Sequence, residues 1–555
     1  MLKSKLFVVL AFVFYCLTVN QSICVTDSGI EGIKKSNGTP VTELNIVWGQ
    51  WAPADYLQQM GSLYEAQTGI KVNIIQDPWT TYSTHFYSAM EAHSTAWDMV
   101  VGDSQWLGQS TTQGYYLNLT DFLVSEGIKE SVTPATITYY SEYPSGSGQY
   151  WAFPMEGDAM GWAYRKDLFE NADEKAAFQA QFGYPLTVPA TFQQLRDIAT
   201  FFTRPDQGLY GVALFTQKDY DAMTMGFENL LFSWGARWQN PVTNEVLSII
   251  NSPKAVEAIQ FYKDLYSACQ APGLNNAANV ETNNAFITGK AVMCMNYFGF
   301  FTDLVNPEIN PLAGNTGFFA NPAGPDGDQH AALGGQGISI ISFISPERQQ
   351  AAKNFIKWFA REDVQATWAE KGGLSCNKNV LKSDAFLTAK PYNPAFARSM
   401  EFVMDFWNIP QYSLLLDVTQ DELYKFIVED TGTAQASMDS IAVKHNKILL
   451  EYGHIAGVDG THLGQFSLNQ NYPNPFSSCT TIKYHIPVSC RVSVRVCNVF
   501  GQEVSTLVNK HQEAGTYDID WYAADQPAGF YFFHLQTDRS GSAKPETVRK
   551  MLLVK

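Results

Sequence analysis

Two carboxylates spaced two residues apart, Glu156 and Asp158, are the side chains of this sequence best placed to do chemistry. In an extended chain they would lie on one face, about 6.5 to 7 Å apart, a separation that suits the general acid and base of an inverting glycosidase. Such pairs normally flank the scissile bond from different elements, whereas neighbours on one strand end face the same side of a sugar. The spacing therefore favours recognition of a ligand, and a glycan-degrading enzyme stays the alternative.

The stretch around this pair is rich in aromatic residues. Residues 148–169, GQYWAFPMEGDAMGWAYRKDLF, carry Trp151, Phe153, Trp162 and Tyr164. A ring can cover the apolar face of a pyranose while a carboxylate accepts hydrogen bonds from its hydroxyls. We interpret the stretch as half of a ligand cleft, with Trp162 and Tyr164 in the packed strand behind it.

Indole and carboxylate side chains also meet in WGQW, residues 48–51, and in DSQW, residues 103–106. Both follow a predicted strand, and open α/β sheets bind ligands at the carboxyl ends of their strands. Trp51, Asp103 and Trp106 are therefore candidate ligand contacts. Asp103 is equally suited to cap the helix that follows.

Three further candidates could form the facing wall. Tyr297 lies in GKAVMCMNYFGF and Gln336 in GGQG, where glycines let the backbone approach a ligand and the amide offers both a donor and an acceptor. A plain glycine turn is the alternative for GGQG. Trp234, in LLFSWGARW, suits a ligand site or the core.

Other chemistries lack their motifs in this sequence. It has no HExxH, G-x-S-x-G, P-loop or C-x-x-C pattern, so we predict no catalytic residue, metal ligand or cofactor. Cys479 and Cys497 could face each other across a hairpin, while the other thiols outside the first 24 residues are expected to be isolated.

Charge and length narrow the possible partners. The chain has 555 residues, with 54 acidic against 37 basic side chains and a formal charge of -17, so it repels polyanions and nucleic acid is not an expected partner. Its length predicts two or three domains. We expect a monomer that binds a small-molecule solute.

The first 24 residues have the pattern of an export signal. Lys3 and Lys5 precede an apolar run from Leu6 to Val19, which is too short to be preferred as a membrane span. Residues 25–43 are small and polar and predict a flexible tether. Cys24 lies near the expected cleavage point, and its lipidation is left open.

Residues 44–462 alternate strands with helices. Strands are predicted at 44–48, 71–75 and 97–101, and this alternation implies a parallel sheet covered on both faces. Helix starts are predicted where Thr191 pairs with Gln194 and where Ser252 and Ser345 precede a proline. Residues 420–453 are predicted to be helical.

Residues 463–555 change character. Helical patterns give way to short alternating strands at 481–486, 491–499, 517–521, 529–536 and 547–554, which predicts a small all-β sandwich of the immunoglobulin-like kind.

Residues 42 to about 455 resemble the family 1 extracellular solute-binding proteins of ABC importers, which include the maltose binders. The motifs in order are ELNIVWG, WDMVVGDSQWLGQ, YWAFPMEGDAMGWAYRKDLF, VPATFQQLRDIATFF, FENLLFSWGA, FITGKAVMCMNYFGF and GGQGISIISFISPERQQAAKNFIKWFA. The resemblance implies a type II periplasmic-binding-protein fold, in which two α/β lobes close on a sugar, and we expect an oligosaccharide. Its binding positions carry over to the residues Trp51, Asp103, Trp106, Glu156, Asp158, Trp234, Tyr297 and Gln336.

Residues 466–555 resemble the type A sorting domain of the type IX secretion system, through FSLNQNYPNPF, TTIKYHIP, VCNVFGQEVSTLVN, AGTYDIDW, PAGFYFFHLQ and KMLLVK. Ser477, Ser478 and Cys479 replace the usual turn after NPF. This resemblance implies the secretion machinery as a partner and a place at the cell surface or outside the cell. A binder coupled to an ABC permease would instead work in the periplasm, and a binder of a non-sugar solute is a further alternative.

Overall fold

The structure is a computed structural model that describes residues 40–455 except 242, and residues 467–554 except 469, 472, 487–489, 513–514 and 538–545. The predicted export signal, Cys24 and nearly all of the predicted tether lie outside the described residues. The domain boundary predicted at residue 462 lies outside them as well.

One nine-stranded sheet organises residues 43–404. Its order is β2-β1-β3-β8-β4-β6-β5, with β7 added on β4 and β9 added on β8. The strands are β1 (Glu43–Gly49), β2 (Lys71–Asp77), β3 (Met99–Asp103), β4 (Phe153–Arg165), β5 (Tyr210–Ala213), β6 (Ala291–Tyr297), β7 (Thr316–Ala320), β8 (Ala331–Ile340) and β9 (Val403–Met404).

The sheet is mixed, whereas the sequence pattern predicts a parallel one. β1 runs parallel to β2 and β3, and β5 runs parallel to β6. The two central strands break this pattern, because β8 runs antiparallel to β3 and β4 runs antiparallel to β8, β6 and β7. The rule of right-handed crossovers concerns parallel neighbours, so it did not predict these antiparallel strands.

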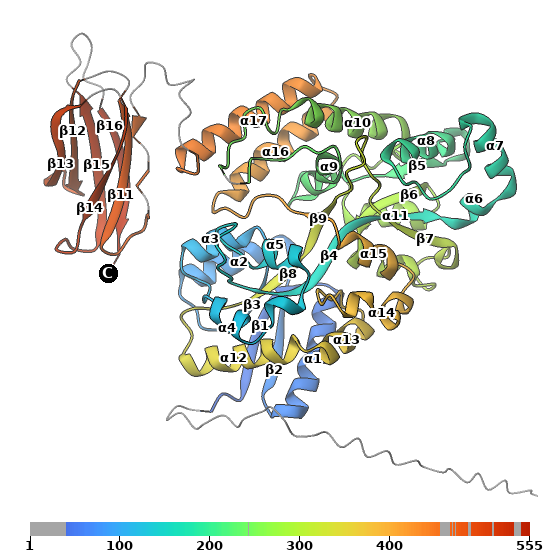
Figure 1. The fold of residues 1–555 in the computed structure, drawn as a ribbon, viewed down its shortest axis with the longest axis horizontal. Coiled ribbons are helices and arrows are strands. Elements are labelled where there is room, and N and C mark those ends of the chain that lie inside the picture. The colour runs from blue at the N-terminus through green and yellow to red at the C-terminus, as the bar shows by residue number, and fades with distance from the viewer. Residues whose placement is uncertain are drawn as a thin grey trace, which may run out of the picture. The chain divides into compact units, whose positions relative to one another are not determined.

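β4 is the strand that both halves of the sheet share. Its first eleven residues are all buried, as expected for a strand covered on both faces. β4 pairs with β8 from Phe153 to Ala159, then changes partner and pairs with β6 from Met160 to Tyr164. Figure 1 shows β4 and β8 passing between two helix-covered lobes.

The helices before β4 are α1 (Ala52–Thr68), α2 (Trp79–Glu91), α3 (Trp106–Thr112), α4 (Thr120–Ser125) and α5 (Pro134–Tyr140). Between β4 and β8 lie α6 (Lys166–Glu170), α7 (Ala172–Phe182), α8 (Phe192–Phe202), α9 (Ala222–Ser233), α10 (Pro253–Cys269) and α11 (Asn279–Ile287). After β8 come α12 (Pro346–Phe359), α13 (Glu362–Lys371), α14 (Asp384–Ala389), α15 (Asn393–Ser399), α16 (Tyr412–Ile427) and α17 (Ala434–Glu451).

Each lobe has its own hydrophobic core. The N-terminal lobe is built around β1, β2 and β3 with α1, α2 and α12, and the C-terminal lobe around β5 and β6 with α8, α9, α10, α16 and α17. Two predicted cap residues form their bonds, since Thr191 Oγ1 accepts from Gln194 N–H and Ser345 Oγ accepts from Arg348 N–H. Ser252 begins α10 without a side-chain cap.

The helical region predicted at 420–453 is two helices. α16 begins earlier than predicted, at Tyr412, and ends at Ile427, and α17 begins at Ala434. Gly432 lies between them with a φ of 77°, a left-handed conformation that glycine adopts without strain and that a continuous helix excludes.

Residues 467–553 form a separate all-β unit with the core expected of a small sandwich. Its sheets have the orders β10-β11-β14 and β13-β12-β15-β16. The strands are β10 (Ser467–Leu468), β11 (Cys479–Ile486), β12 (Cys490–Asn498), β13 (Glu503–Gln512), β14 (Gly515–Tyr522), β15 (Gly529–Thr537) and β16 (Glu546–Leu553). The sequence pattern missed β10 and β13.

The hairpin that would have joined Cys479 to Cys497 is not formed. Cys479 lies on β11, which pairs with β10 and β14, and Cys497 lies on β12, which pairs with β13 and β15. The prediction of a facing pair was wrong because consecutive strands entered different sheets.

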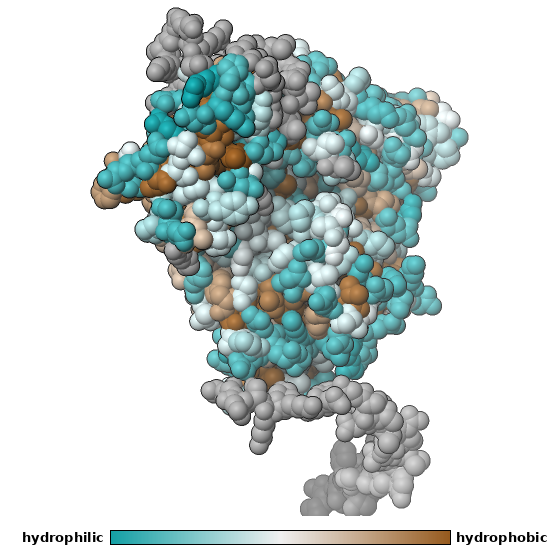
Figure 2. All heavy atoms as spheres, turned by 60° about the vertical axis from the view of Figure 1, so that its left-hand side comes forward, coloured by the Kyte–Doolittle hydropathy of each residue, from teal (hydrophilic) through white to brown (hydrophobic). Residues whose placement is uncertain are grey.

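The face drawn in Figure 2 is mostly hydrophilic, with apolar residues in small separate patches, as is usual for the surface of a globular protein. Among the described helices, none combines the length and apolar character that crossing a membrane requires.

Candidate ligand-binding site

Asp103 lies at the carboxyl end of β3 and is held from two sides. Nε2 of Gln336, its register neighbour on β8, donates to Oδ1 at 2.8 Å. The hydroxyl of Tyr220, in the loop before α9, donates to Oδ2. Burial raises the pKa of Asp103 to about 6, while the hydrogen bond from Gln336 acts in the opposite direction. Asp103 therefore joins the N-terminal lobe to the C-terminal lobe and does not cap α3, whose N-terminus has no side-chain cap.

A second group of predicted residues meets around Asp158. Its carboxylate accepts from Gly299 N–H at 3.1 and 3.2 Å and from Ala159 N–H at 2.8 Å. A Cβ at Gly299 would lie 2.7 Å from Asp158 Oδ2 and 3.2 Å from the Trp51 ring, so only glycine allows this approach. Burial raises the pKa of Asp158 to about 8.

Trp51 presents its indole beside Asp158. Its ring makes edge contacts with Trp48 and Trp79, at centroid distances of 5.5 and 5.7 Å. Trp51 is partly exposed, and its Nε1 has no hydrogen-bond partner among the described residues. An aromatic face next to a carboxylate, with an unused donor, is suited to a polyhydroxylated ring.

Tyr297 lies beside Asp158 and near carboxylates of the C-terminal lobe. A Cβ at Gly334 would lie 2.5 Å from its ring and 3.2 Å from Asp158 Cβ, so Tyr297 closely approaches β8 beside Asp158. Burial raises the pKa of Tyr297, and the nearby carboxylates of Asp221 and Glu228 raise it further. These carboxylates come from the C-terminal lobe.

Acidic side chains gather where the lobes meet. Burial raises the pKa of Asp405 to about 7 and lifts those of Asp221 and Glu228 well above the usual carboxyl range. Glu228 Oε2 accepts from Trp238 Nε1 at 2.9 Å. An ionised carboxylate accepts hydrogen bonds and a protonated carboxyl can also donate one, so these groups suit a ligand rich in hydroxyls, which do both.

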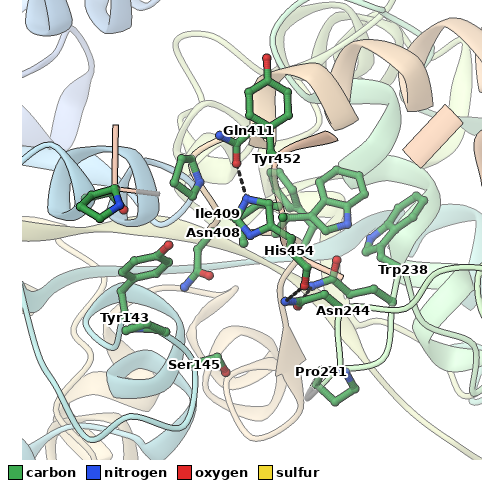
Figure 3. Close-up of a pocket in the computed structure, with 18 of the residues that line it drawn as sticks. Tyr143, Ser145, Trp238, Pro241, Asn244, Asn408, Ile409, Gln411, Tyr452 and His454 are labelled. Carbon is green, nitrogen blue, oxygen red and sulfur yellow. Dashed lines mark hydrogen bonds between the residues drawn. The ribbon is translucent and has the colours of Figure 1, made fainter. Parts of the chain in front are cut away.

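A hollow lined by residues of both lobes reaches Asp405, but none of the predicted site residues lines it. Figure 3 shows Tyr143 and Ser145 on one side of it, Trp238, Pro241 and Asn244 on the other, and Gln411 and His454 between them. Asp405 and Trp407 also line it. Trp407 lies 5.1 Å from Trp238 between ring centroids.

Three predicted site residues are not brought together with the others. Glu156 is fully buried and accepts from Leu374 N–H at 3.1 and 3.2 Å, so it faces the N-terminal lobe. Trp106 is fully buried and stacks on Phe86 at 5.2 Å. Trp234 packs against Phe192 at 5.3 Å, past the end of α9.

The sequence reasoning missed the contributions of Tyr220, Asp221, Glu228 and Asp405. A signal existed for the last of these, because Asp405-Phe406-Trp407 repeats the pairing of a carboxylate with an indole that marked residues 103–106. Tyr220 had no such signal, since it reaches Asp103 from the other lobe. Within the described residues, no group of three or more His, Cys, Asp or Glu side chains is arranged to hold a metal ion.

Comparison with known families divides the chain in the same way. Residues 59–395 match the family described as bacterial extracellular solute-binding protein. Residues 470–549 match the secretion system C-terminal sorting domain. This tail marks the protein for export to the cell surface or the extracellular space.

Curated relatives include a mannitol-binding protein of Pseudomonas aeruginosa, 24% identical over 263 residues that cover 47% of this chain and 57% of that protein. A diacetylchitobiose binding protein of Streptomyces coelicolor is 22% identical over 378 residues, 66% of this chain and 81% of that protein. The chain spans about half the length of the first curated relatives it matches, 57%, 56% and 50%. These relatives are named as binding proteins.

Solved structures share the fold. A solute-binding protein from Agrobacterium radiobacter, in complex with ribitol, has a TM-score of 0.62 at 22% identity over 74% of this chain and 100% of that one. A maltose-bound protein of T. maritima has a TM-score of 0.62 at 24% identity over 73% and 100%. With a family match across more than half of its residues, the chain belongs to the bacterial extracellular solute-binding proteins.

Proposed function

We propose that the protein captures a neutral carbohydrate, of oligosaccharide size, between its two lobes without reacting with it. The observation that carries this proposal is the meeting of the Trp51 ring, the Asp158 carboxylate and the Gly299 backbone at β4, the strand that both lobes share. Tyr297 adds a second ring, and Asp103 and Gln336 add an acceptor and an amide.

The acidic lining supports a neutral ligand. Asp103, Asp221 and Asp405 influence one another electrostatically, and Glu228 adds to them. An anionic sugar would be repelled by every carboxyl of this group that is ionised and would disfavour ionisation of the others, in a region of low dielectric constant. Mannitol, diacetylchitobiose, ribitol and maltose, named for the relatives and similar structures, are uncharged and rich in hydroxyls.

The surroundings of Glu156 support binding without hydrolysis. An acid and base pair must both reach the glycosidic bond, whereas Glu156 is fully buried and bonded to the backbone of Leu374. The sorting tail favours capture at or beyond the cell surface, with the secretion machinery as a partner, and an ABC permease would then receive the sugar at a later step.

Isothermal titration tests the function. Maltotriose, N,N′-diacetylchitobiose and mannitol are titrated into the folded full-length protein, with a glucuronate disaccharide as the charged comparison. We expect at least one neutral compound to bind and the glucuronate to bind more weakly. Folded protein that binds none of the neutral compounds, or that releases sugar products on long incubation, contradicts the proposal.

A further inference from the structure

The C-terminal lobe contains a second cavity, of about 670 Å³, within the size range of small-molecule sites. It is formed by the first turns of α8 and α17, the exposed side of α10 from Pro253 to Asp264, the residue that follows α9, and the turn at Gly324 and Pro325. Every lining residue belongs to the region between β4 and β8 or to α17. The shape of this cavity therefore does not depend on how the two lobes meet.

Three aromatic side chains line the inner part of the cavity. Phe192, Trp234 and Phe261 are 1%, 3% and 8% exposed. The Trp234 ring lies 5.3 Å from Phe192 and 5.0 Å from Phe261, tilted in both cases. Packed on one another, these nearly buried rings give the cavity an apolar inner wall.

Trp234 also has an unused donor. Its Nε1 is buried and has no hydrogen-bond partner among the described residues. Buried polar groups are nearly always paired, and each exception needs an explanation. Because Trp234 lines the cavity, a ligand oxygen that reaches this nitrogen would supply the missing acceptor.

The rim carries polar groups of both kinds. Its side chains are Gln193, Arg196, Glu257, Gln260, Asp264 and Gln435. Glu257, Gln260 and Asp264 are exposed and, at positions i, i+3 and i+7, share one face of α10. The Arg196 guanidinium lies 5.0 Å over the Phe261 ring. Mixed donors and acceptors around a ring suit a neutral ligand with many hydroxyls better than an ion.

Three helix N-termini meet at this rim. α8, α10 and α17 have 11, 17 and 18 residues and all begin at the cavity. α10 begins without a side-chain cap, which leaves first-turn N–H groups available to a ligand oxygen.

We propose that this cavity is a second binding site, for one sugar unit of a neutral carbohydrate chain, separate from the site between the lobes. α9 separates the two sites, since Asp221 precedes it and Trp234 follows its 12 residues, a length of about 18 Å. A protein with both sites stays attached to a glycan while the lobes open.

The test uses full-length protein that carries Trp51→Ala, in which binding between the lobes is impaired. Maltotriose, cellotriose and N,N′-diacetylchitobiose are titrated by calorimetry and by saturation-transfer NMR. We expect at least one of them still to bind. Adding Trp234→Phe, which keeps a ring and removes the N–H, or Glu257→Gln should weaken this remaining binding about fivefold to tenfold.

Glu170→Gln, an exposed carboxylate of the same lobe outside the cavity, is the matched control and should change nothing. Thermal unfolding confirms that each variant folds. The proposal is overturned if Trp51→Ala protein binds none of the three sugars, or if its binding is unchanged by both Trp234→Phe and Glu257→Gln. Wild-type binding that depends on Trp234 and Glu257 but is unaffected by Trp51→Ala would overturn the function proposed above and leave this site standing.

Discussion

The hydroxyl of Tyr220 donates a hydrogen bond to Oδ2 of Asp103, and the two residues belong to different lobes. Tyr220 has a φ of 57° and is 44% exposed, a conformation that is uncommon for a residue with a side chain. Gln336 holds the other carboxylate oxygen of Asp103 from β8. Gln336 therefore holds the acceptor, Asp103, in place within the N-terminal lobe. The donor, Tyr220, moves with the C-terminal lobe.

Tyr220→Phe should favour the open arrangement of the lobes. It removes a hydrogen bond to a carboxyl group, worth about 1.5 to 3 kcal/mol when the carboxyl is charged, so we expect sugar affinity to fall about tenfold or more. The loss should lie mainly in a faster dissociation rate, measured by stopped-flow fluorescence. Small-angle scattering of the sugar-free variant should give a larger radius of gyration than the wild type, and identical scattering together with unchanged affinity would contradict the role of Tyr220.

Trp51 and Trp106 should respond differently to truncation. Trp51→Ala removes a partly exposed ring beside Asp158, so we expect a loss of sugar affinity with little change in stability. Trp106→Ala removes a fully buried ring stacked on Phe86, and such a cavity costs about 3 to 5 kcal/mol of unfolding free energy. Denaturant unfolding and titration of both variants make the comparison, and equal effects on stability would show that Trp51 is a core residue.

Asp158 should make stability depend on pH. Burial raises its pKa from 3.8 to about 8, so the folded protein holds this proton more tightly than the unfolded chain. Its contribution to stability is therefore complete below pH 3.8 and is lost as the pH rises to about 8. Asp158→Asn keeps an oxygen for Gly299 N–H and cannot ionise.

The measurement is the difference in unfolding free energy between wild type and Asp158→Asn from acid to neutral pH. We expect this difference to move in favour of the variant as the pH rises. Glu170→Gln, whose carboxylate is exposed, should track the wild type throughout. Parallel profiles for wild type and Asp158→Asn would rule out the proposed protonation of Asp158.

Removal of residues 463–555 should leave sugar binding intact. The buried residues of the tail form a core of their own, and the cores of the two lobes contain none of them. We expect the truncated protein to bind sugar with unchanged affinity and to stay in the periplasm, as measured by titration and by cell fractionation. If the truncated protein still reached the cell surface, the sorting signal would lie outside residues 463–555.

The sequence predicted elements whose signals are local. The strands predicted at 44–48 and 71–75 lie within β1 and β2, and the Thr191 capping box is present because its two hydrogen bonds involve residues three apart. Strand pairing is not local, which is why the reversal of β4 and β8 and the sheet change between β11 and β12 were missed.

The site was predictable to the same extent. Asp103 and Gln336 were identified separately, and the structure makes them register neighbours. Glu156 and Asp158 looked equivalent, yet one carboxylate bonds to Leu374 and the other to Gly299. The partner of each carboxylate is set by the segment that packs against it. Those segments contain Leu374 and Gly299, which lie more than a hundred residues away in the sequence.

Asp158 lies two residues before Tyr297's register partner, Met160, at the point where β4 leaves β8 for β6. A group at the fulcrum of a hinge moves least when the lobes rotate, whereas Tyr220, carried by the C-terminal lobe, must travel to reach Asp103. A ligand can thus contact Asp158 before the lobes close, and it is enclosed by Tyr220 only after they have closed. Substitutions near the fulcrum should alter the first encounter, and substitutions at Tyr220 should alter how long the ligand stays.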